Sequence, residues 1–140
     1  MNIFIDANIL VTVIKHEQPF FDECARVLSL SSYKYNLYIT ALTLGICFYQ
    51  AEKKFGKTEA KRRLQKIIQN LMIARCDDDE ARQAFTNIAV NDFEDGLQYY
   101  SALNSKCYGI VTYNIKDYHF SKIPVFTPQS LLLFLSSQKK

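Results

Sequence analysis

The sequence predicts an α/β protein, a three-layer α/β/α sandwich whose central, mostly parallel sheet has about five short strands. Short apolar segments with a β-branched bias alternate with longer segments whose apolar residues recur at helical spacing. Strands separated by helices form parallel sheets that are covered on both faces. The 140 residues include only four Gly and three Pro and no repeat or low-complexity stretch, so we expect one domain over residues 1–140.

Five segments have the length and composition of strands. The first is a wholly apolar run, which is typical of a strand buried on both faces of a parallel sheet. Each later segment follows at a distance that leaves room for a crossover helix. The expected strands cover residues 3–5, 38–40, 72–74, 109–112 and 125–127.

Capping signals indicate where the helices begin and end. Pro19 and Pro128 suit the first turn of a helix, and Gly56 suits a helix end. The acidic run 77–80 fits a cap and a first turn, where the helix dipole favours negative charge. The expected helices cover residues 9–14, 19–31, 41–55, 57–71, 77–90 and 93–105, and a last helix starts at Pro128.

Composition excludes several classes of protein. An apolar share of 49% is too high for an intrinsically disordered chain, and no apolar run approaches the roughly 20 residues that cross a bilayer. Met1 leads directly into a strand without the features of a secretory signal, so we expect a cytoplasmic protein. Four scattered cysteines lack metal-binding spacing, and we expect reduced, mostly buried thiols at Cys24, Cys47, Cys76 and Cys107.

Charge is segregated along the chain although the net charge is only +3. The segment 53–66 holds seven basic residues and one acid, and the segment 77–95 holds seven acids and one base. This pattern suggests a face for a polyanion and a separate site for a cation or a basic partner. The alternative interpretation is that both segments are solvated helix surfaces.

Acidic residues follow predicted strands at places that should meet at one edge of the sheet. Asp6 ends the first strand, Asn114 and Asp117 follow the fourth, and the pair Glu94 and Asp95 opens a helix. In open α/β sheets the functional crevice lies beyond the carboxyl ends of the strands. Clustered carboxylates repel one another unless a divalent cation neutralises them. Each acid alone also fits a structural role, as a cap, a first-turn acid or a turn residue.

These segments resemble the PIN domains, and in particular the VapC-type toxin ribonucleases of bacterial toxin–antitoxin modules. Residues 3–10 (IFIDANIL) look like the opening strand with its D-x-N step, and 93–98 (FEDGLQ) resemble the helix start with the central aspartate. Residues 110–118 (IVTYNIKDY) are similar to the motif that carries the last acid, and the segment from Ile123 resembles the closing strand. The resemblance spans nearly the whole chain in the family's order.

The resemblance implies a Mg²⁺ or Mn²⁺ site. Asp6, Asp95 and Asp117 would be the catalytic metal ligands, and Glu94 a further acid. Polar groups that orient these ligands or the substrate would be Asn8, Thr112 and Asn114. The family usually carries a glutamate in a pattern like Thr-x-x-Glu after the second strand, and here we expect Gly45 to fall at that position. Four carboxylates would thus become three.

The implied activity is metal-dependent hydrolysis of RNA phosphodiester bonds, with an antitoxin that would mask the pocket by inserting an arginine. A homodimer would form through the helices that start at Pro19 and Ala41. The basic segment 53–66 would attract the RNA backbone, and Tyr113 or Tyr118 would stack on a base. Neither histidine is needed for this chemistry, and we expect His16 and His119 at the surface.

Two other interpretations remain open from the sequence. The first is a catalytically impaired PIN-like module, in which Gly45 replaces a metal-binding glutamate and which binds RNA or antitoxin. The second is another α/β protein with an acidic pocket, such as a phosphotransfer receiver or a phosphatase. A receiver needs a mid-chain strand-end aspartate and a later strand-end lysine, and a haloacid-dehalogenase-type phosphatase needs D-x-D, where this chain has Asn8 in the second position.

Overall fold

A five-stranded, wholly parallel sheet forms the centre of the molecule, as described by a computed structural model for residues 1–138. The strand order is β3-β2-β1-β4-β5. The strands are β1 (Asn2–Ile5), β2 (Asn36–Ile39), β3 (Met72–Ile73), β4 (Gly109–Val111) and β5 (Val125–Phe126). The predicted α/β class with five short strands is confirmed, while the expected domain end at residue 140 lies outside the described residues.

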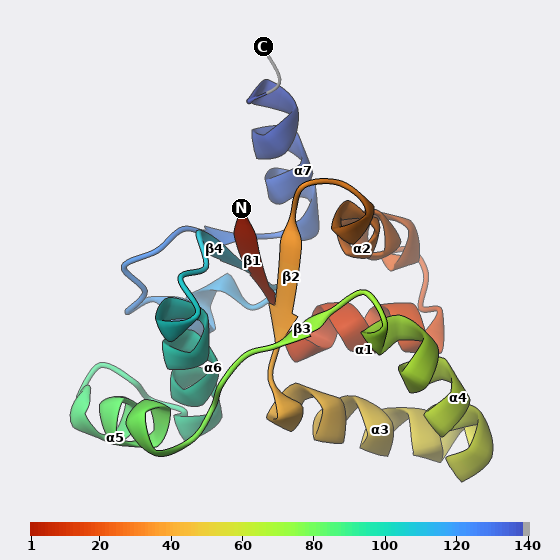
Figure 1. Cartoon of the computed structure of the whole chain (residues 1–140), viewed down its shortest axis with the longest axis horizontal. Coiled ribbons are helices and arrows are strands. Elements are labelled where there is room, and N and C mark those ends of the chain that lie inside the picture. The colour runs from red at the N-terminus through yellow and green to blue at the C-terminus, as the bar shows by residue number, and fades with distance from the viewer. Residues whose placement is uncertain (139–140) are drawn as a thin grey trace.

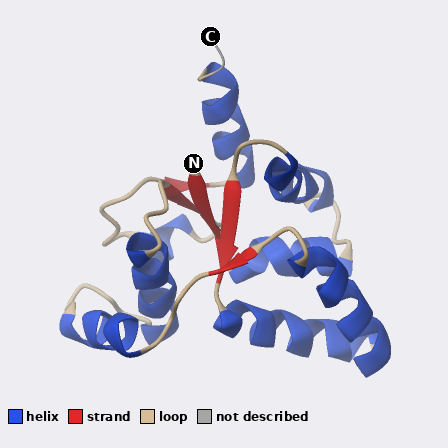
Figure 2. Ribbon diagram, in the orientation of Figure 1, coloured by secondary structure: helices blue, strands red, loops and turns tan. Residues whose placement is uncertain are grey.

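Helices cover both faces of this sheet (Figures 1 and 2). One face packs against α1 (Ala7–Lys15), α2 (Phe21–Leu28), α3 (Ala41–Phe55), α4 (Lys57–Ile68) and α7 (Pro128–Ser137). The other face packs against α6 (Phe93–Asn104), which is itself flanked by α5 (Asp78–Thr86). Two short 3-10 helices, η1 (Ser29–Ser32) and η2 (Ile115–Tyr118), complete the described elements.

Alternation along β1 divides the core between the two faces. Ile3 and Ile5 belong to the cluster under α1, α3 and α7, while Phe4 belongs to the cluster under α6. Successive side chains of a strand point to opposite faces, so a strand with apolar residues at every position is buried on both sides. All three side chains are at most 1% exposed. The opening apolar run is therefore a central strand, and Asp6 begins where it ends.

Several helix boundaries agree with their capping signals. The helix predicted over residues 41–55 is α3, capped by Thr40, whose Oγ1 accepts a hydrogen bond from the Thr43 amide at 3.1 Å. It ends at Gly56, where φ is 81°, a conformation that L side chains rarely adopt. At the start of α5, Asp77 and Glu80 form a reciprocal capping box.

Two predicted helices are shorter than expected. The segment 19–31 is α helix only over α2 and then tightens into η1. The segment 77–90 ends at Thr86, because the Asn87 side chain accepts a hydrogen bond from the Ala89 amide at 3.0 Å and so stabilises a turn in place of helix.

The expected environments of the cysteines and histidines are largely confirmed. Cys24, Cys47 and Cys107 are buried, Cys76 is partly buried, and all four are free thiols. His16 and His119 are both exposed. Among residues 1–138, no helix has the length and hydropathy that a membrane span requires.

Candidate active site

The predicted acids gather at the carboxyl edge of the sheet, around a pocket of about 360 Å³. Asp6 follows β1, Asp95 lies in the first turn of α6, and Asp117 lies in η2 after β4. In Figure 1 this edge lies at the lower end of β1 and β2, where α1 and α3 begin. The pocket is lined by Asp6, Ala7, Asn8, Val11, Thr12, Glu17, Ile46, Gln50, Glu94, Asp95, Gln98 and Asn114.

Asp6 is held in one orientation by a set of hydrogen bonds. Its Oδ1 accepts from the Ala7 amide at 2.7 Å, and its Oδ2 accepts from Thr112 Oγ1 at 2.7 Å and from Asn8 Nδ2 at 3.3 Å. Thr112 Oγ1 in turn accepts from the Asn114 amide at 2.9 Å. The predicted orienting residues thus surround this carboxylate, which is 6% exposed.

The pocket disfavours added negative charge. Burial raises the pKa of Asp6, and the charge of Asp117 adds to that rise. The pKa of Asp95 rises to about 7, first because of burial, then because of the charges of Asp92 and Asp117. Burial, together with Asp92, also raises the pKa of Glu94. These acids are close enough to repel one another, which is the electrostatic condition that a cation relieves.

The position of Asp95 depends on how α6 begins. The Asp92 side chain caps the helix, and its Oδ1 accepts from the Glu94 amide at 2.8 Å and the Asp95 amide at 3.2 Å. The next residue, Gly96, packs so closely against α5 and the segment after it that a Cβ there would lie 2.9 Å from Ala84 Cβ and 2.7 Å from Val90 Cγ1. Cap and close packing together direct the first turn of α6 toward the pocket.

Sequence reasoning missed four polar residues of the pocket, Thr12, Glu17, Gln50 and Gln98. Gln98 is 1% exposed, and its Oε1 accepts from Thr43 Oγ1 at 3.2 Å. It lies three positions after Asp95 on the same helical stripe, so spacing could have identified it. Gln50 on α3 and Glu17 after α1 also line the pocket. Glu17 lies in a loop, and no periodicity in the sequence indicates where a loop residue points.

The assignment of Gly45 to the pocket was wrong. A Cβ at Gly45 would have no heavy atom within 4 Å, whereas the neighbouring side chain, Ile46, lines the pocket. Thr43 faces the buried side of α3, and one turn further on the same face is position 46. The chain therefore presents an apolar side chain, Ile46, where we expected a missing acid at Gly45.

The predicted stacking role of Tyr118 was also wrong, because this side chain is 2% exposed. Its hydroxyl has no hydrogen-bond partner among residues 1–138. Tyr113 is half-buried, and its hydroxyl donates to the carboxylate of Glu23 and contacts Cys24 Sγ at 3.3 Å. The Tyr113 ring is partly exposed and has a tilted contact with Phe20, so its stacking role stays a prediction.

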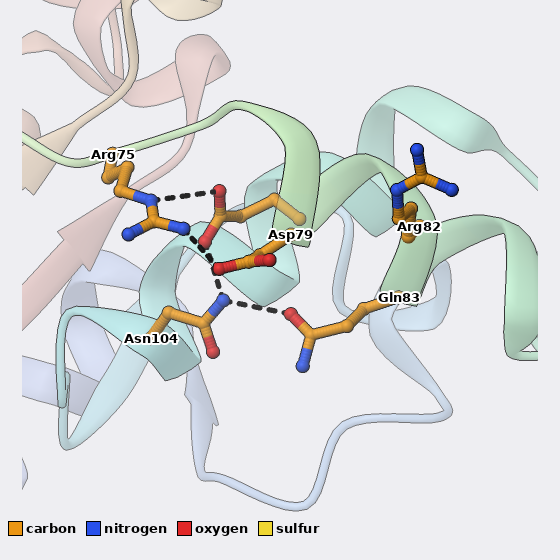
Figure 3. Close-up of a pocket in the computed structure, with 6 residues that line it drawn as sticks. Arg75, Asp79, Arg82, Gln83 and Asn104 are labelled. Carbon is orange, nitrogen blue, oxygen red and sulfur yellow. Dashed lines mark hydrogen bonds and ion pairs between the residues drawn. The ribbon is translucent and has the colours of Figure 1, made fainter.

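The acidic run 77–80 does not belong to the pocket. Two of its members, Asp79 and Glu80, line a separate hollow at the other end of α6, together with Arg75 (Figure 3). Arg75 pairs with Asp77 at 3.0 Å and with Asp79, and Glu80 accepts from Asn104 Nδ2 at 2.6 Å. These contacts join β3, α5 and α6, so this half of the acidic segment has a structural role.

The carboxylates do not form a closed ligand set. Within residues 1–138, no group of three or more His, Cys, Asp or Glu side chains is placed to hold a metal ion. Asp117 is exposed and acts on Asp6 and Asp95 through its charge. The acids thus lie at one edge of the sheet and interact through their charges, and the pocket between them is open.

The fold and pocket define an α/β protein with an acidic site at the carboxyl edge of a parallel sheet. Over residues 2–116 the sequence matches the PIN domain, and the chain belongs to this family. The earlier resemblance is thereby confirmed. No curated protein sequence matches the chain.

Several solved structures share the fold. The VapBC2 complex of Rickettsia felis, bound to a DNA fragment from its promoter, has a TM-score of 0.70 at 18% identity and covers 91% of this chain and 98% of that chain. A toxin–antitoxin complex of Klebsiella pneumoniae has a TM-score of 0.68 at 20% identity and covers 89% and 96%. VapC20 of Mycobacterium tuberculosis, a toxin that cleaves the sarcin–ricin loop, has a TM-score of 0.66 at 12% identity and covers 86% and 98%. At these identities the likeness concerns the fold.

Proposed function

We propose that the chain is a cytoplasmic, Mg²⁺- or Mn²⁺-dependent endoribonuclease and the toxin of a toxin–antitoxin pair. The observation that carries the proposal is the acidic pocket at the carboxyl edge, where burial raises the pKa of Asp6 and of Asp95 and the nearby charge of Asp117 adds to both shifts. Membership of the PIN family and the likeness to toxin–antitoxin structures support it.

The chemistry of the donors fits a hard divalent cation, which prefers carboxylate oxygens. Asp6, Asp95 and Asp117 would hold it, with Glu94 as a further acid. Since no three of these groups converge among the described residues, water and phosphate oxygens of the substrate would complete the coordination. A bound cation of this kind lowers the pKa of water and stabilises negative charge on a phosphate group.

The protein's own residues would prepare this site in three ways. Thr112 and Asn8 fix the Asp6 carboxylate, so that its orientation needs no change when substrate arrives. Buried Gln98 faces the same carboxylate, and hydrogen bonding to it lowers the pKa of Asp6 against the effect of burial. Asn114, at the pocket wall, would orient a phosphate or ribose oxygen.

The proposed partners are RNA, an antitoxin and a second copy of the chain. An acidic, half-open pocket suits an inserted arginine of an antitoxin, which would form charge-assisted hydrogen bonds there. A dimer contact would cover exposed apolar side chains such as Phe85 and Ile88, which are 75% and 98% exposed. These lie on α5 and just after it, and not on the helices that start at Pro19 and Ala41.

The test is cleavage of a mixed RNA substrate with Mg²⁺ or Mn²⁺, comparing the wild type with Asp95→Asn and Asp117→Asn. The exposed helix acid Asp22 provides a matched control, Asp22→Asn. We expect activity in the wild type and the control, and loss of activity in both pocket variants and in EDTA. Cleavage that persists in Asp95→Asn or without metal would overturn the proposal.

A second candidate, a catalytically impaired module, is favoured by one observation: Ile46 lines the pocket with an apolar group. This reading predicts that RNA or antitoxin binds while RNA stays intact. In the same assay, RNA binding by a folded wild type without cleavage in either metal would select it.

A further inference from the structure

We propose that a basic corner, defined as Lys15, Lys53, Lys54 and Lys57, carries the backbone of single-stranded RNA away from the acidic pocket. The inference rests on the proposed function, and it adds the form of the substrate and the direction in which the strand leaves the site.

The pocket is elongated toward this corner. From Asp6 and Asp95 it extends between α1 and α3 to Gln50 and Glu17. The two helices pack against each other and run in Figure 1 from the sheet edge to the right of the molecule. With nine residues at about 1.5 Å each, α1 is about 13 Å long, the reach of a short stretch of nucleic acid.

Contacts between side chains connect the pocket wall to the basic corner. On α3 the pocket residues Ile46 and Gln50 are followed, at helical spacing, by Lys53 and Lys54. Lys54 Nζ donates to the Lys15 carbonyl at 2.9 Å and so joins the ends of α1 and α3. Lys15 Nζ lies 3.6 Å from the carboxylate of Glu17, which lines the pocket.

The positive charge of Lys53 and Lys57 is available to a ligand. The one acid of the segment 53–66, Glu59, pairs with Arg62 at 2.6 Å and with Arg63 at 2.8 Å. Neither Lys53 nor Lys57 has an ion-pair partner among residues 1–138. Unpaired lysines on an exposed face attract phosphate groups, and release of counterions contributes to their affinity.

An aromatic ring lies beside this charge. Tyr49 is 56% exposed, and Lys53 Nζ is 4.4 Å from its ring centroid. An exposed ring next to a cation suits a base and its phosphate, because the base stacks on the ring. Stacking on this ring requires an unpaired base, which a single strand offers and a duplex does not. We therefore assign the surface to single strands; an acidic protein segment would use the lysines but leave the ring and the pocket unexplained.

The test compares two double variants of equal charge. Lys53→Gln with Lys57→Gln removes charge from the corner. The control, Lys34→Gln with Lys106→Gln, removes two exposed lysines before β2 and β4, at the opposite edge of the sheet. Binding of a fluorescent single-stranded RNA on the order of a dozen nucleotides is measured by anisotropy across a salt series in EDTA, which prevents cleavage.

We expect the corner variant to bind more weakly at low salt, with a log–log salt slope smaller by about 1.4, or about 0.7 per lost phosphate contact. The control should retain the wild-type slope. Equal salt slopes in all three proteins, or equal losses of RNA affinity in both variants, would overturn the proposed role of the basic corner. So would competition by polyglutamate as strong as that of unlabelled RNA, because the corner would then be a surface for an acidic protein.

Kinetics with metal separate this inference from the proposed function. In the corner variant we expect KM to rise at constant kcat for a long strand, with no change for a trinucleotide that fills only the pocket. If the wild type binds RNA through Lys53 and Lys57 without cleaving it, the basic corner is an RNA-binding surface but the proposed enzymatic activity is wrong. If the wild type cleaves long RNA and the corner variant has the same KM, the proposed enzymatic activity holds but the basic corner does not bind the strand.

Discussion

Thr112 Oγ1 donates a hydrogen bond to Oδ2 of Asp6 at 2.7 Å and so joins the ends of two neighbouring strands, β1 and β4, at the acidic pocket. Thr112 is fully buried, and the carboxylate that it contacts is nearly so. The contact brings together residues far apart in the sequence, and it fixes the orientation of the acid on which the proposed chemistry depends.

Replacing Thr112 by Val should loosen this acid without changing the size of the side chain. We expect a loss of about 2 kcal/mol in the free energy of unfolding, the typical value for a buried hydrogen bond to a charged group. Mn²⁺ affinity should fall by about 10- to 100-fold, as for other residues that orient metal ligands. Urea unfolding and calorimetry measure the two effects. Thr112→Ser keeps the hydroxyl and should keep the affinity; equal losses in Val and Ser would contradict the role of the hydrogen bond.

Ile46→Glu should add a carboxylate to the pocket and raise Mn²⁺ affinity by about tenfold or more, corresponding to at least about 1.4 kcal/mol. The neighbouring change Gly45→Glu is the control, because that side chain would enter open space. It should leave metal affinity unchanged and stabilise α3 by up to about 1 kcal/mol, the cost of an internal glycine in a helix. A larger affinity gain from Gly45→Glu than from Ile46→Glu would contradict the corrected assignment.

Asp95 should make the metal-free protein less stable as pH rises. Its pKa increases from 3.8 in the unfolded chain to about 7 in the folded protein, so the folded state binds the proton more tightly. Stability should therefore fall between about pH 4 and pH 7 and level off above, and the half-open position of the group keeps the change small. Urea unfolding across this range should show a shallower decline in Asp95→Asn, with both proteins in EDTA. A wild-type stability that rises toward pH 7 relative to Asp95→Asn contradicts the assignment.

Tyr118→Phe removes a buried hydroxyl that has no partner among the described residues. Since an unpaired buried polar group is costly, we expect the variant to be equally stable or more stable, by up to about 1 kcal/mol. Thermal and urea unfolding measure this change, with Tyr99→Phe as control, because the Tyr99 hydroxyl accepts from the Lys122 amide at 3.1 Å. A clear loss of stability in Tyr118→Phe would mean that the hydroxyl is satisfied, either through water or by the nearby Asp6 carboxylate.

Most of the fold could be predicted because its signals are local. The wholly apolar β1, the helix end at Gly56 and the cap at Asp77 are contained in short windows of sequence, whereas the cap at Thr40 was taken for the end of a strand. The rule that strand ends meet at one edge then brought Asp6, Asp95 and Asp117 to the same place. The early end of α5 was missed because a side chain, Asn87, competes with the helix for backbone hydrogen bonds.

The rest of the site depends on orientation, which the sequence encodes poorly. On a helix, successive side chains differ in direction by about 100°, so an error of one residue replaced Ile46 by Gly45. Glu17 enters the pocket only because the loop after α1 packs there. The two halves of the acidic segment look alike in sequence, but Asp77 and Asp79 pair with Arg75 while Asp95 faces the pocket.

Calorimetric titration with Mn²⁺ measures whether the pocket holds a divalent cation through Asp6. The comparison is between the wild type and Asp6→Asn, which keeps an oxygen to cap α1 but removes the charge. We predict binding to the wild type and its loss in a folded Asp6→Asn. No binding to the wild type, or undiminished binding to the variant, would contradict the account.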